Sequence, residues 1–168
     1  GMSFHGGLIG VIVATYIFSK IKNLNYRLYF DTIACVAPIG IFLGRIANFI
    51  NGELYGTPTE KPWGVIFPKI DNVPRHPSQI YEAVLEGVLL FAILNLLIGK
   101  KNFSHGVISL LFLVLYGILR IISEQFRQPD EHMGYIFGYL SMGSVLSAVM
   151  IILGMLFLAR FIFNEKNR

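Results

Sequence analysis

The stretch that decides the fold is residues 32–56, which read TIACVAPIGIFLGRIANFINGELYG. Its first half, 32–43, has no charged residue, and its second half places Arg45 within the same apolar run. A cationic side chain near the centre of a membrane segment costs at least ~2.5 kcal/mol, so it usually has a partner or a task. In a helix at 100° per residue, the side chains of Arg45, Asn48 and Asn51 fall, together with Gly52, within about a third of the circumference. The stretch therefore predicts a polar stripe on a membrane helix, formed by Arg45, Asn48 and Asn51.

The composition of the whole chain is typical of a membrane protein. Of its 168 residues, 54% are hydrophobic and only 14% are charged. The apolar runs approach the ~20 residues that cross a ~30 Å hydrocarbon core as a helix, and they lack the alternation of strands. A soluble bundle of unusually apolar helices is the alternative. We expect an all-α polytopic membrane helix bundle with about five transmembrane helices, at 5–19, 31–50, 82–98, 105–125 and 135–159.

The basic residues orient these predicted spans. Eight lie in the 20–30 loop, the 99–104 loop and the C-terminal tail, against four in the opposite loops. Because short cytoplasmic loops are enriched in Lys and Arg, we expect the first group and the C-terminus to be cytoplasmic. The proline-rich segment 51–80 is then an extracytoplasmic loop at the membrane interface. The net charge of +4 reflects this topology and does not indicate a nucleic-acid partner.

A second polar stripe is predicted on the fourth span. Its four members are spaced four, four and three residues apart, within about a quarter of a helix circumference: Tyr116, Arg120, Glu124 and Arg127. One interpretation is an intrahelical ladder of ion pairs that neutralises itself. Another is a stripe that faces the Arg45 stripe across one cavity. Two arginines would suit a lipid phosphate there, because the guanidinium fork binds phosphate oxygens in pairs. We expect room for one phosphate between Arg45 and Arg120.

A third cluster lies at the predicted membrane edge, in residues 75–86, which read RHPSQIYEAVLE. It contains His76 and two glutamates four residues apart, Glu82 and Glu86. A like-charged pair at this spacing is unfavourable unless arginines or water lie close by.

A fourth cluster lies near the N-terminus, where residues 3–10 read SFHGGLIG. Its glycines would let another backbone or a lipid approach closely. A histidine at a membrane edge is more often structural than catalytic, so His5 has two interpretations on position alone. On the predicted topology all four clusters lie near the outer leaflet, although they come from four parts of the chain. That convergence predicts a functional site.

Several kinds of chemistry have no pattern in the sequence. The four histidines show no metal-ligand spacing and no His-Glu-x-x-His pattern, so we expect no metal and no cofactor. Ser78 follows a proline without the Gly-x-Ser-x-Gly pattern of a serine hydrolase. Cys35, the single cysteine, cannot form an internal disulfide and is expected to be a small buried hydrophobic residue.

These residues carry a resemblance to a known family. Four blocks are similar, in the same order, to the signature blocks of the prolipoprotein diacylglyceryl transferases: 3–10, 44–56, 75–87 and 116–130. The second block, with GRIANFINGE, is highly specific, whereas a His-Gly-Gly block alone is weak. Family members carry further membrane helices before the His-Gly-Gly block. We therefore expect one transmembrane domain over 1–168, corresponding to the C-terminal five spans of a seven-span protein.

The resemblance implies a transferase of the bacterial inner membrane. It would transfer the diacylglyceryl group of phosphatidylglycerol to the lipobox cysteine in a prolipoprotein signal peptide, forming a thioether. Arg45 and Arg120 match family arginines associated with head-group binding and catalysis, and His5 matches an important histidine, to which we assign the role of base. Tyr116 and Glu124 are placed in the same catalytic group. The remaining positions are expected to bind substrate: Asn48, Asn51, Glu53, Gly56, His76 and Glu82.

Two other classes of protein stay open at this point. A transporter or channel fragment would use intramembrane charges to line a path, and would show inverted repeats or broken helices in two halves, which the sequence does not contain. A non-catalytic membrane scaffold would turn its polar stripes toward a partner subunit. In that case Arg45 and Arg120 would point away from one another.

Overall fold

The computed structural model describes residues 4–98, 103–129, 135–136 and 140–166. Two helices come first, α1 (Phe4–Ile21) and α2 (Tyr26–Asn51). A third segment joins α3 (Ser78–Glu82), the π-helical η1 (Ala83–Leu89) and α4 (Leu90–Ile98) end to end, and α5 (Val107–Glu124) and α6 (Met142–Lys166) follow. Short strands form two antiparallel pairs in the described loops, β1 (Val65–Ile66) with β2 (Pro74–Arg75) and β3 (Tyr135–Ile136) with β4 (Leu140–Ser141).

The predicted membrane helix bundle is confirmed. Four described segments are long and apolar enough to cross a bilayer: Tyr26–Asn51, Ser78–Ile98, Val107–Glu124 and Met142–Asn164. The apolar part of α1, Ile9–Ile21, is shorter. The predicted start of the last span at residue 135 is wrong, because β3 and β4 pair there and α6 begins only at Met142. Mean hydropathy does not distinguish an apolar hairpin from the start of a helix, since both are rich in the same side chains.

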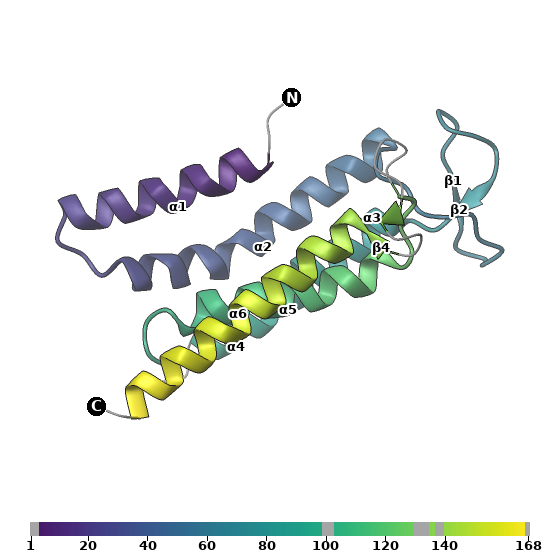
Figure 1. Ribbon diagram of the computed structural model, residues 1–168. Coiled ribbons are helices and arrows are strands. Elements are labelled where there is room, and N and C mark those ends of the chain that lie inside the picture. Colours follow the sequence, from purple (N-terminus) through teal and green to yellow (C-terminus); the bar gives the residue numbers. More distant parts are fainter. Residues whose placement is uncertain (1–3, 99–102, 130–134, 137–139, 167–168) are drawn as a thin grey trace.

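Four of the helical segments pack into a bundle, and α1 packs chiefly against α2 (Figure 1). The buried core consists of Cys35 from α2, Leu90 and Leu94 from α4, and Ile108 from α5. Cys35 is 4% exposed, which confirms the expected buried position. Large apolar side chains cover much of the outer helix surfaces, as contact with lipid requires. The loop between α2 and α3 caps one end of the bundle, beside the end of α5 (Figure 1).

Candidate active site

Arg45, near the end of α2, and Arg120, near the end of α5, contact the same carboxylate. The Nε atom of Arg45 lies 2.8 Å from Oε2 of Glu82, and Nη1 of Arg120 lies 2.7 Å from Oε1. The Glu82 side chain is fully buried. Two guanidinium groups from distant parts of the sequence are thus held on one side chain, at the end of the bundle where α3 begins.

Glu86, one turn further along the same segment, also bridges the two arginines. Its Oε2 lies 3.3 Å from Nη2 of Arg45, and its Oε1 lies 3.3 Å from Nη1 of Arg120. The hydroxyl of Ser123 donates a hydrogen bond to Oε1 at 2.9 Å. Glu86 belongs to the π-helical turn η1, and such turns are frequent at functional sites. Glu82 and Glu86 therefore have the nearby arginines that make a like-charged pair at this spacing tolerable.

Two more charged side chains extend this arrangement along α5. Nη2 of Arg120 lies 2.6 Å from Oε2 of Glu124, one turn later on the same helix. Nη1 of Arg127 lies 3.9 Å from Oε1 of Glu82. An intrahelical pair is therefore present on α5, but Arg120 also contacts Glu82 and Glu86, which contact Arg45 on α2. The charges of α5 are thus not neutralised within that helix alone.

We call these six residues the ion network: Arg45, Glu82, Glu86, Arg120, Glu124 and Arg127. Its formal charges cancel, and the two glutamates of the third cluster occupy the line between the two arginines where a phosphate was expected. Arg45 has 16% of its side chain exposed, whereas Glu82 and Glu86 have none. An anion that approaches the ion network would therefore meet Arg45 first.

The loop between α2 and α3 is fastened to the end of α5 at Gly56. The N–H of Gly56 donates to the carbonyl of His76 at 3.1 Å, and its own carbonyl accepts from Nη1 of Arg75 at 3.1 Å. The N–H of Thr57 donates to the carbonyl of Phe126 at 3.0 Å. A Cβ atom at residue 56 would overlap the backbone oxygen of His76 and lie 2.6 Å from that of Phe126. Glycine is therefore required here by packing, whatever binds nearby.

Gly56→Ala should loosen this junction and lower the stability of the protein by about 1–3 kcal/mol, the usual cost of overpacking a tight site. The measurement is the melting temperature in detergent, together with the rate of proteolysis in the loop 52–77. Gly40→Ala is the matched control, because a Cβ there meets nothing within 4 Å. Equal melting temperatures for the two variants would contradict the packing argument.

His76 lies in an aromatic cluster beside this junction. Its Nδ1 atom is 3.1 Å from the Tyr81 hydroxyl, which also accepts a hydrogen bond from Trp63 Nε1 at 2.8 Å. The His76 ring packs edge-on against Phe126, with ring centroids 5.2 Å apart. These four residues line a pocket of about 470 Å³ together with Lys61, Ile80, Val84 and Leu85. The His76 ring is thus held in place by the Tyr81 hydroxyl and the Phe126 ring.

Arg75 makes several contacts within the same loop, between α2 and α3. Its Nη2 lies 2.6 Å from Oδ2 of Asp71, and its guanidinium carbon lies 5.0 Å from the centre of the Tyr55 ring. The hydrogen bond from Arg75 keeps the pKa of the Asp71 carboxyl below its usual value. The positive charge of Arg75 is therefore engaged in the loop and does not belong to the ion network.

Comparison with known proteins shows the family of this chain. Residues 1–160 match the family model described as prolipoprotein diacylglyceryl transferase. The chain belongs to this family.

Curated relatives called phosphatidylglycerol--prolipoprotein diacylglyceryl transferase are similar over nearly the whole chain. The protein from Rickettsia bellii (strain OSU 85-389) is 55% identical over 156 residues, which is 92% of this chain and 59% of that protein. The protein from Mannheimia succiniciproducens is 52% identical over 159 residues, 94% of this chain and 59% of that protein. The chain thus spans about 59% of the length of the curated relatives that it matches.

The residues expected from the diacylglyceryl transferase resemblance separate into groups. Arg45, Glu82, Arg120 and Glu124 are brought together in the ion network. Tyr116 lies one turn before Arg120 on α5, where its ring stacks on Phe112 at 5.7 Å. Gly56 and His76 belong to the loop junction.

The other expected positions lie at the ends of helices. Asn48 is half-buried in the last turn of α2, and its carbonyl accepts from the N–H of Glu53 at 2.9 Å. Asn51 and Glu53 are exposed, and among the described contacts neither side chain reaches the ion network. His5 lies in the first turn of α1, but its side chain is outside the described part of the chain.

Three residues that make contacts at the candidate site were missing from the residues expected from sequence. Glu86 had a signal, because its spacing from Glu82 demanded nearby cations. Arg127 also had one, as the last member of the second stripe. Ser123 had none, since a serine one turn after Arg120 in an apolar helix is ordinary, and its role depends on the hydrogen bond to Glu86.

Proposed function

We propose that this protein transfers the diacylglyceryl group of phosphatidylglycerol to the lipobox cysteine of a bacterial prolipoprotein. The observation that carries the proposal is the pair of arginines, half-buried Arg45 and buried Arg120, held on the shared carboxylates of Glu82 and Glu86. Membership of the transferase family and the names of the curated relatives support the choice of substrates.

The reaction needs an anion site and a thiolate. The substrate sulfur attacks the carbon of the diacylglyceryl group that is bonded to the phosphate. The bond between that carbon and the phosphate oxygen breaks with its electron pair on oxygen, and glycerol phosphate leaves. The thiol proton goes to a base. Arginine forks suit the developing phosphate charge, and preorganised donors lower the barrier most when they are aimed at that charge beforehand. Glu82 and Glu86 would keep the guanidinium groups of Arg45 and Arg120 in place between turnovers.

The proposed location is the bacterial inner membrane, with the C-terminus in the cytoplasm and the ion network near the outer leaflet. The distribution of Lys and Arg among the loops supports this orientation. The lipobox cysteine of a signal peptide that crosses the membrane would arrive at the same depth. In a scaffold, Arg45 and Arg120 were expected to point apart, and their shared carboxylates count against that interpretation.

The test uses the protein at the full length that its gene encodes, incubated with phosphatidylglycerol and a lipobox peptide. We expect the peptide to gain the mass of one diacylglyceryl unit as a thioether, with release of glycerol phosphate. A peptide with serine in place of the lipobox cysteine is the control and should gain nothing. No mass gain, under conditions in which the Rickettsia bellii relative modifies the peptide, would refute the proposal.

His5→Gln should slow the reaction most at low pH and least at high pH, if His5 raises the thiolate fraction of the substrate. A free thiol titrates near ~8.5, so above that pH the peptide supplies its own nucleophile. The measurement is the ratio of wild-type to variant rates from about pH 6 to pH 9.5. A flat ratio would remove the base role from His5 and leave the two-arginine site unaffected.

A further inference from the structure

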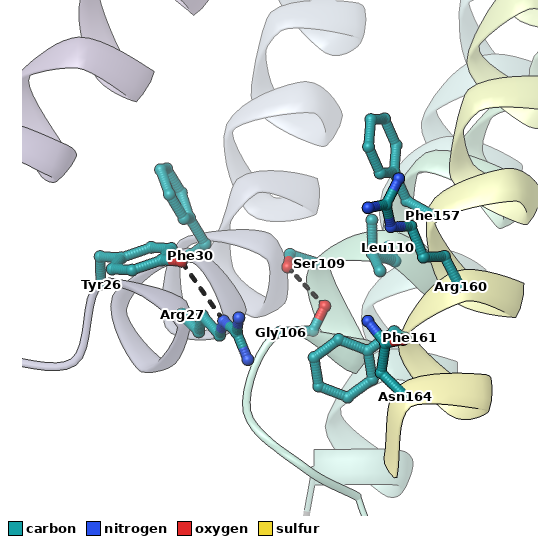
Figure 2. A pocket seen from close by; sticks show the side chains of 10 residues that line it. All are labelled: Tyr26, Arg27, Phe30, Gly106, Ser109, Leu110, Phe157, Arg160, Phe161 and Asn164. Carbon is teal, nitrogen blue, oxygen red and sulfur yellow. Dashed lines mark hydrogen bonds between the residues drawn. The ribbon is translucent and has the colours of Figure 1, made fainter. Parts of the chain in front are cut away.

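Another pocket, lined by Arg27 and Arg160, lies at the opposite end of the bundle from the ion network. It forms where α2 and α5 begin and α6 ends, and has a volume of about 460 Å³ (Figure 2). Arg27 in this pocket and Arg45 in the ion network lie on the same helix, roughly 27 Å apart at 1.5 Å per residue. That separation is close to the ~30 Å thickness of a hydrocarbon core, so the two sites face opposite membrane surfaces.

On two of the three helices that form the pocket, α2 and α6, an arginine lies nearer the helix end and a phenylalanine lies deeper in the bundle. Arg27 and Arg160 lie toward the ends of α2 and α6, and Phe30 and Phe157 lie one turn deeper on those helices. On α5, Leu110 lies one turn deeper than Gly106, and Phe161 lies at the level of the Arg27 guanidinium. Tyr26, Ser109 and Asn164 complete the lining. A ligand with an anionic end and an apolar end would match this layering.

The arginines of this pocket are available for a ligand. Arg27 lies with its guanidinium carbon 5.3 Å from the centre of the Phe161 ring, and its Nε donates to the Tyr26 hydroxyl at 3.4 Å. Among the side chains that the structure describes, neither Arg27 nor Arg160 has a carboxylate within ion-pair distance. Two cations gathered around one cavity, with no ionic partner among the described side chains, favour an anion there.

The floor of the pocket is already bonded internally. The N–H groups of Gly106 and Ser109 donate to the two carboxylate oxygens of Asp31, at 2.6 and 2.8 Å. Asp31 is only 3% exposed. The start of α5 is therefore occupied, and an anion in this pocket would be held by the arginine side chains. Gly106, with φ 105°, leaves room for the Arg27 side chain to cross over it.

We propose that this pocket binds the phosphate of an anionic phospholipid, from the leaflet opposite the ion network. The two arginines match the charge of the head group, and Phe30, Leu110 and Phe157 lie deeper, on the side of its acyl chains. Basic pockets between membrane helices hold acidic head groups in this way. A free phosphate would share the charge but would leave the layer formed by Phe30, Leu110 and Phe157 without a partner.

The test measures lipid binding to the delipidated full-length protein by native mass spectrometry. The probes are phosphatidic acid and phosphatidylcholine with the same acyl chains. We expect tighter binding of phosphatidic acid, weakened roughly fivefold by Arg27→Gln or Arg160→Gln and roughly twenty-fivefold by both. Lys22→Gln is the matched control, because it removes one exposed charge at the same end of the bundle without touching the pocket.

Three results would overturn the proposal. The double variant could bind phosphatidic acid as the wild type does, or Lys22→Gln could weaken binding as much as either arginine change. Inorganic phosphate could also raise the melting temperature as much as the lipid, through the same arginines, which would make the site one for free phosphate. The melting temperature of each variant without lipid shows that it is folded, so that lost binding can be assigned to the pocket.

Discussion

Arg120→Lys should lose most of the proposed transfer activity, roughly 10²–10³-fold, although the positive charge is kept. Arg120 uses Nη1 and Nη2 to contact Glu82 and Glu124 at once, at 2.7 and 2.6 Å. A lysine ammonium is a point charge that cannot reproduce this fork. Losing one donor to a developing anion typically costs ~3–4 kcal/mol of transition-state stabilisation. The measurement is kcat/KM for lipobox peptide modification.

Arg75→Lys is the control for this change. Arg75 also pairs with a carboxylate, but it lies in the loop and outside the ion network. We expect it to keep most of the activity. If Arg120→Lys also turned over at close to the wild-type rate, only the positive potential at that position would matter, and the argument from the guanidinium fork would fail.

Glu82→Gln should be the most destabilising single change in the ion network, by about 3–5 kcal/mol. Glu82 is fully buried and contacts Arg45 and Arg120, so its neutralisation leaves an uncompensated positive charge among buried groups. Breaking a buried ion pair from one side typically costs that much. The measurement is the free energy of unfolding in detergent, or the shift of the melting temperature.

Glu53→Gln is the matched control, because Glu53 is exposed and the same atoms are exchanged. It should change stability by less than about 0.5 kcal/mol, as exposed substitutions usually do. Equal losses for the two variants would mean that Glu82 contributes no more than a surface carboxylate. The two arginines would then be held by other contacts, and the inference that Glu82 is their main partner would be wrong.

The architecture was predictable because the membrane imposes it. Charge-free runs such as 32–43 have few alternatives to a spanning helix. The two polar stripes were also readable, since helical periodicity places Arg45 and Arg120 on defined faces. The predicted start of the helix that begins at Met142 was wrong, because residues before it pair as strands. Hydropathy does not distinguish an apolar strand from an apolar helix.

The partners within the site were harder to predict. Helical spacing places residues on one helix but does not say which faces of two helices meet. For that reason a phosphate was expected between the arginines where Glu82 and Glu86 lie. The π-helical turn that carries Glu86 has no sequence signal of its own. The hydrogen bond from Ser123 has no sequence signal either, because it depends on how α5 packs against that turn.

The equal numbers of arginines and glutamates in the ion network have a consequence for the order of events. A lipid phosphate brings a negative charge that the network has no surplus cation to match, so its entry would require a carboxylate to swing aside or to take up a proton. In the proposed reaction, the thiol that attacks the lipid has a proton to release at the same place. Binding of the lipid head group and ionisation of the thiol would then be thermodynamically linked. A carboxylate that takes up the thiol proton would favour binding of the phosphate, and bound phosphate would favour release of that proton to the carboxylate.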